Sequence, residues 1–355
     1  MLKNIRARFK NYNALFISNP VNVNYLTGFT GSRGLILITR KKACFFTDFR
    51  YLEYAKKIIP KEFEVIQIDK KWKTDWPSIL KKYKINSLGI EEDYLTYSQF
   101  LGLRKISKGV KLIKSEQIIE KLRQFKSVKE LQYLKKSQEI NEKLLKKTLG
   151  FIKPGVTEKD IEWFILQNIR AVGADGTSFI PIVAFGNNSS IPHHQNSDRK
   201  LKKGDIILID MGVKYKGYCS DMSRTFFTKK PTDLQSKVYQ TVLDAQKAAI
   251  KSLKNGVLIS KITGAAMKII EKAGYKENFQ HGLGHGTGLD IHELPNLGSE
   301  KPEKLLQNMI TTIEPGIYLP KNFGVRIEDM VIITGAGYTN ITKAPKELKD
   351  ALIEL

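Results

Sequence analysis

The sequence predicts a two-domain α/β protein, and three observations support this. With 355 residues, the chain is longer than one hydrophobic core comfortably supports. Its first third alternates short apolar runs with helical segments, and a second helical pattern starts at Ser127. A hydrophobic content of 41% and a charged content of 27% are typical of a globular protein. We therefore expect one domain in residues 1–122 and another in residues 123–355.

The first domain is expected to be a small α/β unit. Strands are predicted where apolar, β-branched and aromatic residues cluster, at residues 14–18, 34–38 and 43–47. A helix is predicted for residues 51–59, because Pro60 cannot continue it.

Helices begin the second domain. Ser127 and Glu130 have the spacing of a capping box, in which each side chain bonds the backbone N–H of the other residue. The apolar spacing that follows predicts a long helix ending near Gly150, and Thr157 begins another that runs to Ile169. From residue 180 onward strands and turns dominate, apart from two predicted helices at residues 233–254 and 260–273.

Composition excludes several classes of protein. No apolar run approaches the ~20 residues needed to cross a bilayer, and the basic N-terminus lacks the apolar stretch of a secretory signal. Cys44 and Cys219 are the only cysteines, so nothing suggests an oxidising compartment. We expect a cytoplasmic protein that does not associate with a membrane.

The charge balance raises the question of nucleic acid. The chain has 59 basic and 36 acidic residues, a formal net charge of +23, and clustered lysine and arginine attract phosphate. Here the lysines are spread along the chain, and no recognition helix, zinc finger or RNA-binding signature accompanies them. A solvated basic surface explains this pattern better than a specific nucleic-acid site.

Histidines and carboxylates gather in the second domain. All five histidines follow residue 192, interleaved with carboxylates, and histidine is both a common metal ligand and a common proton carrier near neutral pH. They are His193, His194, His281, His285 and His292. This confinement to one region favours a functional site there.

Asp210 and Asp221 are predicted to meet on one face of a hairpin. Asp210 ends a nearly continuous apolar run, where an unpaired carboxylate is costly to desolvate. Residues 214–217 have the pattern of a turn, and residues 218–227 that of a returning strand that carries Asp221. Two carboxylates so placed need a cation between them. The alternative is that Asp210 caps a turn and Asp221 is exposed.

Glu314 and Glu328 repeat the pattern. A strand over residues 309–313 delivers Glu314 just before a Pro-Gly turn, and a strand over residues 325–332 carries Glu328. Arg326 lies two residues before Glu328, so both side chains point to the same face of the strand. Arg326 can therefore orient a carboxylate ligand without binding the metal itself. A surface ion pair is the alternative for Arg326.

Residues 281–288 are rich in glycine and deliver His285. The segment lacks the Lys-Ser/Thr of a phosphate-binding loop, and its glycines allow the backbone to approach a buried group closely. Four carboxylates and one imidazole suit divalent Mn, Co or Fe better than a thiolate zinc site. Two such ions sharing carboxylates could activate a water for hydrolysis.

These segments together resemble the pita-bread metallopeptidases, a family that includes methionine aminopeptidase, Xaa-Pro aminopeptidase, prolidase and the metal-free creatinase. The motifs that carry the resemblance are GDIILIDMG, GYCSDMSRTF, HGLGHGTGLDIHE, ITTIEPGIY and GVRIEDMV. The family's five metal-ligand positions are all filled, by Asp210, Asp221, His285, Glu314 and Glu328. The resemblance implies a C-terminal pita-bread (α+β) catalytic domain with two divalent ions, manganese first, with cobalt, iron or zinc as alternatives.

The first domain extends the resemblance. Residues 22–31, NVNYLTGFTG, and 46–51, FTDFRY, are similar to the creatinase-like N-terminal domain of the proline-specific branch. The resemblance therefore implies an Xaa-Pro aminopeptidase, which hydrolyses peptides with proline in second position and releases the preceding residue. Prolidase, an Xaa-Pro dipeptidase, is the nearest alternative, and a non-catalytic module that binds nucleic acid or protein is the alternative of another class. The resemblance also implies a homodimer.

The resemblance further assigns roles to individual residues. His193 matches a histidine that contacts substrate, His292 one that stabilises the tetrahedral intermediate, and His281 lines the same cleft. Glu314 would be both a ligand and the proton carrier. His194 lies outside the pattern and is expected to be polar surface.

One position departs from the prolidase pattern. Prolidases that resemble this chain often carry an arginine shortly after the counterpart of His292, where it binds a dipeptide's carboxylate. This chain has Asn296 there, which favours the aminopeptidase over the dipeptidase. A cation from elsewhere, such as Arg33 of the first domain, could replace it.

Overall fold

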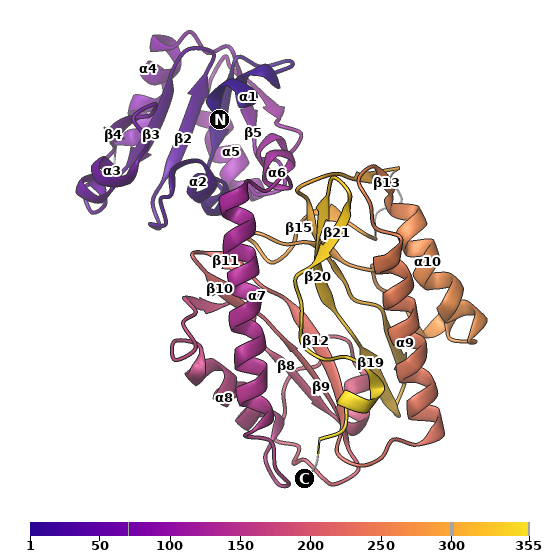
Figure 1. Cartoon of the computed structure of the whole chain (residues 1–355). Helices are drawn as coiled ribbons and strands as arrows, with labels where there is room; N and C mark the ends of the chain where they lie inside the picture. Colours follow the sequence, from indigo (N-terminus) through magenta and orange to yellow (C-terminus); the bar gives the residue numbers. More distant parts are fainter. Residues whose placement is uncertain (70, 299–301, 354–355) are drawn as a thin grey trace. The chain divides into compact units, whose positions relative to one another are not determined.

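The computed structural model describes residues 1–69, 71–298 and 302–353. The chain divides into two compact units, Met1–Arg123 and Gln124–Leu355 (Figure 1). The predicted two-domain α/β architecture is confirmed. The predicted domains, residues 1–122 and 123–355, stay a prediction, and their boundary lies one residue from this division.

The first unit is built on a six-stranded sheet of order β4-β3-β2-β1-β5-β6. Its strands are β1 (Ala14–Ile17), β2 (Leu35–Thr39), β3 (Ala43–Thr47), β4 (Glu64–Gln67), β5 (Ser87–Ile90) and β6 (Lys111–Lys114). Strand β2 pairs antiparallel with both neighbours, whereas the other pairs are parallel. The three strands predicted for this unit are β1, β2 and β3.

Helices cover both faces of this sheet. They are α1 (Leu2–Ala7), α2 (Pro20–Thr27), α3 (Leu52–Ile58), α4 (Trp72–Lys82), α5 (Tyr97–Ile106) and α6 (Ile118–Arg123). Successive side chains of a strand point to opposite faces. Leu15 and Ile17 of β1 join the apolar cluster with α1, α2, α3 and α6. Ala14 and Phe16 join the cluster formed with α4 and α5.

The second unit contains the four predicted helices. They are α7 (Val128–Leu149), α8 (Glu158–Asn168), α9 (Asp233–Lys251) and α10 (Ile259–Lys272). The capping box before α7 is present, with the side chains of Ser127 and Glu130 each bonded to the other's backbone N–H. Within the residues that the structure describes, no helix combines the length and apolarity needed to cross a membrane.

The strand pairs of the second unit are antiparallel. The strands are β7 (Gly176–Thr177), β8 (Ile182–Phe185), β9 (Ile206–Met211), β10 (Val213–Tyr215), β11 (Tyr218–Cys219), β12 (Met222–Phe227), β13 (Val257–Leu258), β14 (His285–Gly286), β15 (Glu293–Asn296), β16 (Lys304–Leu305), β17 (Ile310–Ile313), β18 (Gly316–Leu319), β19 (Phe323–Arg326), β20 (Asp329–Thr334) and β21 (Gly337–Asn340). Short 3-10 turns occupy Gly186–Ser190, Lys276–Asn278 and Leu348–Asp350.

The two larger apolar cores among the described residues of this unit pack strands against pairs of helices (Figure 1). One core joins α7 and α8 to β8, β9, β10 and β12. The other joins α9 and α10 to β17, β18, β19 and β20. One face of these strands packs against the helices. Polar side chains on the opposite face can therefore lie close to one another.

Candidate metal centre

Three of the five predicted ligands lie where strands are interrupted. Asp221 falls between β11 and β12, Glu314 between β17 and β18, and Glu328 between β19 and β20. The expected continuous strands over residues 218–227 and 325–332 are therefore wrong in this detail. At each interruption the backbone N–H bonds outside its own strand: Glu314 donates to the Leu283 carbonyl (2.9 Å) and Glu328 to the Ser223 carbonyl (3.1 Å).

The two strands of the hairpin pack closely beside the interruption at Asp221. In the hairpin, Asp210 of β9 lies opposite Ser223 of β12. A side-chain carbon on Gly212 would lie 2.1 Å from the Ser220 carbonyl oxygen, so the backbone approaches more closely there than any other residue allows. The predicted hairpin thus exists, with a break that leaves Asp221 free of the strand ladder.

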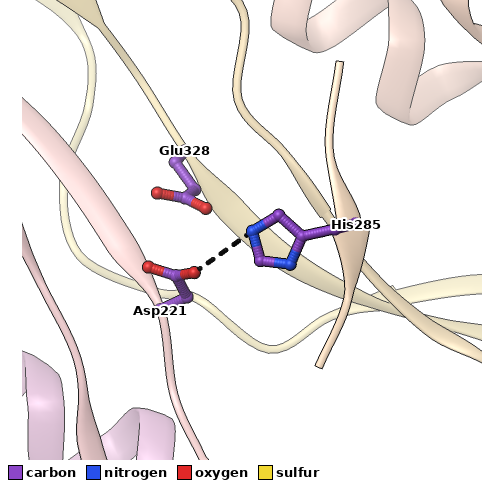
Figure 2. A group of neighbouring side chains, drawn as sticks. All are labelled: Asp221, His285 and Glu328. Atoms are coloured by element: carbon purple, nitrogen blue, oxygen red, sulfur yellow. Dashed lines mark ion pairs between the residues drawn. The ribbon is translucent and has the colours of Figure 1, made fainter. Parts of the chain in front are cut away.

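Asp221, His285 and Glu328 form the centre of the site. One ligand atom from each lies within 4.8 Å of those of the other two, and the side chains point toward one another (Figure 2). His285 Nε2 lies 3.5 Å from Asp221 Oδ2 and 3.3 Å from Glu314 Oε1. The carboxylates of Asp221, Glu314 and Glu328 therefore converge on the imidazole ring of His285.

Arg326 links Asp210 to Glu328 through direct and Ser223-mediated contacts. Its Nη2 lies 2.5 Å from Asp210 Oδ2, and its Nε donates to Ser223 Oγ at 2.8 Å. Ser223 Oγ in turn donates to Glu328 Oε2 at 2.9 Å. The predicted orienting role of Arg326 fits these contacts, since one guanidinium fixes two carboxylates.

Two carboxylate oxygens are left over after these contacts. Asp210 Oδ1 and Glu328 Oε1 are buried and have no hydrogen-bond partner among the described residues. A buried carboxylate oxygen without a donor is costly, and oxygens of this kind are ligands for hard cations. In each of these two carboxylates, the other oxygen is held by Arg326 or Ser223, so the unpartnered oxygen has a fixed position.

The electrostatics of the cluster are those of a site built for cations. Burial raises the pKa of Asp221 well above its ordinary value, and Glu328, Asp210 and Glu314 raise it further. Burial also raises the pKa of Glu314 to about 7 and raises that of Glu328, where the neighbouring carboxylates add to the effect. Burial lowers the pKa of His285, which keeps the imidazole neutral and able to bind a metal. This donor set fits divalent metal ions, which would neutralise the crowded charges.

The remaining histidines surround the cluster. The rings of His292 and His285 have centroids 4.4 Å apart. His281 Nε2 lies 3.1 Å from the Tyr318 hydroxyl, and burial, with Arg326 nearby, lowers the pKa of His281 to about 4. His193 is exposed. Burial lowers the pKa of His292, and the neighbouring His285 lowers it further.

Sequence reasoning missed two contributors. Tyr318 receives a hydrogen bond from Arg326 Nη1 at 2.9 Å while it contacts His281, so it joins two site residues. Its signal was a phenol within the apolar strand that follows Glu314. Thr312 Oγ1 donates to Glu314 Oε1 at 3.1 Å and accepts from the His285 N–H at 3.0 Å, thereby fixing two ligands.

The expectation that His194 is polar surface is wrong. Its side chain is 10% exposed, and Nε2 lies 2.8 Å from Oε2 of the fully buried Glu158. Glu158 also accepts from the N–H and hydroxyl of Ser197. His194 therefore anchors the segment that carries His193, from a glutamate 36 residues away in the sequence.

The chain resembles known proteins along most of its length. Residues 132–335 match Metallopeptidase family M24, and residues 2–125 match the Creatinase/Prolidase N-terminal domain. A protein of Pyrococcus horikoshii named Xaa-Pro dipeptidase is 36% identical over 340 residues, which is 94% of each chain.

Two solved structures show the same fold. An Xaa-Pro dipeptidase from Bacillus anthracis, 36% identical, has a TM-score of 0.95 and covers 100% of this chain and 99% of its own. An X-Pro aminopeptidase from Thermotoga maritima, 33% identical, has a TM-score of 0.88 and covers 96% of this chain and 98% of its own. The creatinase-like N-terminal domain and the pita-bread catalytic domain inferred from the motifs are thereby confirmed. Relatives of both specificities resemble this chain to a similar degree.

Proposed function

We propose that this chain, which belongs to metallopeptidase family M24, is an Xaa-Pro aminopeptidase that uses two divalent metal ions. The observation that carries the proposal is the clustering of four carboxylates near His285, with Asp221 and Glu328 buried and Asp210 and Glu314 partly buried. Four negative charges exceed what one dication neutralises, which favours two ions over one. The metal ligands would be Asp210, Asp221, His285, Glu314 and Glu328.

The bound ions would supply Lewis acidity, which lowers the pKa of water and polarises the scissile carbonyl. The chain's own groups then perform the proton transfers. A carboxylate oxygen of Glu314 accepts a proton from the attacking water and later donates it to the departing proline nitrogen. His292, beside His285, donates a hydrogen bond to the oxygen that becomes negative. Arg326 acts as a positioning residue, because its guanidinium holds Asp210 and, through Ser223, Glu328.

Asn296 supports the aminopeptidase over the dipeptidase. It lies opposite His285 in the β14–β15 pair, so it stands next to the metal ligands. Its side chain is an amide whose Oδ1 accepts the Gly298 N–H at 2.7 Å. A dipeptide brings a carboxylate next to its proline, and an amide offers that carboxylate no balancing charge. A longer substrate has an uncharged peptide bond at this position.

The dipeptidase stays the second candidate, because solved relatives of similar resemblance carry that name. Catalytic efficiency on matched di-, tri- and tetrapeptides that share the first residue and proline distinguishes the two. We expect the longer peptides to be cleaved better, and we expect Asn296→Arg to raise dipeptide hydrolysis selectively. Exclusive activity of the unaltered protein on the dipeptide would identify a prolidase whose cation comes from another part of the molecule.

Three further properties belong to the proposal. Oxygen-rich ligands favour manganese, with cobalt, iron or zinc as alternatives. The two cysteines are buried free thiols, which suits a cytoplasmic protein. A homodimer follows from the resemblance to the proline-specific branch. A non-catalytic binding module would not need a complete set of metal ligands. The presence of a ligand residue at all five positions therefore favours the enzyme.

A further inference from the structure

A buried ion pair lies outside the predicted ligands. Lys126 Nζ and Glu293 Oε2 are 3.0 Å apart, and their side chains are only 1% and 4% exposed. Lys126 lies two residues before α7, and Glu293 is the first residue of β15 and directly follows His292. Both elements are labelled in Figure 1. The pair joins segments 167 residues apart in the sequence.

Stability alone does not explain such a pair. Desolvating two charges often costs as much as their attraction returns, and well-packed apolar residues of similar volume can replace buried ion pairs without loss. Buried ionic groups are retained in some proteins because they fix one arrangement of the chain. The arrangement fixed here is the turn that precedes Glu293.

The Glu293 carboxylate closes that turn from within. Its Oε1 accepts the backbone N–H of Asp290 at 3.0 Å. A side-chain carbon on Gly288 would lie 2.5 Å from both carboxylate oxygens, so the carboxylate packs directly on the backbone of the turn. The N–H of Gly288 also donates to the Asp290 carbonyl at 3.0 Å. One carboxylate thus holds the first half of the turn that ends in His292.

The same turn is tied to the metal ligands on either side of it. The Gly288 carbonyl accepts the Cys219 N–H at 2.7 Å, two residues before Asp221. Glu293 itself lies opposite Gly286, the residue after His285. A displacement of the turn would therefore move His292 relative to both ligands.

We propose that Lys126 and Glu293 are positioning residues, whose buried ion pair fixes the turn at residues 288–292 and thereby sets His292 against His285. The assignment of a role to His292 rests on the proposed function, but the fixing of the turn does not. Lys126 supplies the charge that holds the Glu293 carboxylate in place. The Glu293 carboxylate fixes the backbone of the turn, and the backbone of the turn determines the position of the His292 imidazole.

Two variants test the proposal from opposite ends of the contact. Glu293→Gln keeps the size of the side chain and removes its charge, and Lys126→Gln removes the cation. Each should lower kcat about 10- to 100-fold with unchanged KM and metal content, a loss no greater than the ~100- to 1,000-fold expected for His292→Ala. Glu347→Gln, in the exposed ion pair with Lys247, serves as the control and should leave kcat unchanged.

Non-additivity separates positioning from general damage. If Glu293 acts through His292, Glu293→Gln should have no further effect on kcat in the His292→Ala protein. A full further loss in that background, or wild-type kcat in the single variant, would overturn the proposal.

A readout independent of activity separates the proposal from the function on which it rests. Hydrogen exchange of the peptide spanning residues 286–293 should accelerate at least about tenfold in both variants and not in Glu347→Gln. Unchanged exchange would refute the positioning role even in an active enzyme. If the unaltered protein fails to cleave Xaa-Pro peptides, the proposed function fails, and the exchange data still decide whether the ion pair fixes the turn.

Discussion

Replacing Glu314 with glutamine should stabilise the metal-free protein while it abolishes hydrolysis. In the absence of metal, burial raises the pKa of Glu314 from 4.5 to about 7. The folded protein therefore binds a proton that the unfolded chain has lost, and stability falls as the pH rises from about 4.5 to about 7. Glutamine cannot ionise, and its carbonyl can still accept the Thr312 hydroxyl.

The magnitude follows from the size of the shift. A difference of about 2.5 pKa units at ~1.4 kcal/mol per unit is a cost of about 3 kcal/mol for a charged Glu314 at pH 8. Because the carboxylates are coupled and the fold can relax, we expect a gain of roughly 1–3 kcal/mol for the variant. For a unit of this size the gain corresponds to roughly 3–10 °C in Tm.

The assay is thermal unfolding in chelator at pH 8 and pH 4.5, for the unaltered protein, Glu314→Gln and the control Glu277→Gln. Glu277 is exposed and is not one of the five proposed ligands. We expect a higher Tm for Glu314→Gln at pH 8, little difference at pH 4.5, and no effect of the control at either pH. A variant that is no more stable at pH 8, or equally stabilised at both, would refute the reasoning.

Three further predictions concern the site and the surface. His292→Ala should lower kcat about 100- to 1,000-fold with metal content unchanged, and restoration of full activity by added Mn would show instead that His292 is a ligand. Asp221→Ala should lose both bound metal, measured by elemental analysis, and turnover, so normal turnover would remove Asp221 from the site. Titration with DNA and RNA should show weak binding with steep salt dependence and no sequence preference, because the +23 charge is distributed; tight binding to one defined sequence would favour the binding module.

Local patterns in the sequence were sufficient for the helices and for the candidate ligands. The capping box at Ser127 and the apolar spacing after it depend on neighbours within one turn, so the start of α7 was predicted correctly. The ligand candidates were found because each carboxylate or imidazole sits in an apolar or glycine-rich run where its type is unusual.

Long-range contacts account for what was missed. The breaks at Asp221 and Glu328 lie in sequences with ordinary strand composition. The backbone N–H of Asp221 bonds to Met330 and that of Glu328 to Ser223, both far away in the sequence. His194 was misjudged because its partner Glu158 lies in another element, on a helix 36 residues earlier. No local periodicity encodes such pairings.

Metal titration of chelator-treated protein, with hydrolysis of an Xaa-Pro tripeptide as the readout, tests the central claim most directly. The metal-free protein should be inactive, activity should rise with added Mn and saturate at two ions per chain, and the matched Xaa-Ala tripeptide should not be cleaved. Full hydrolysis without metal, or equal cleavage of both peptides at every metal concentration, would contradict the account.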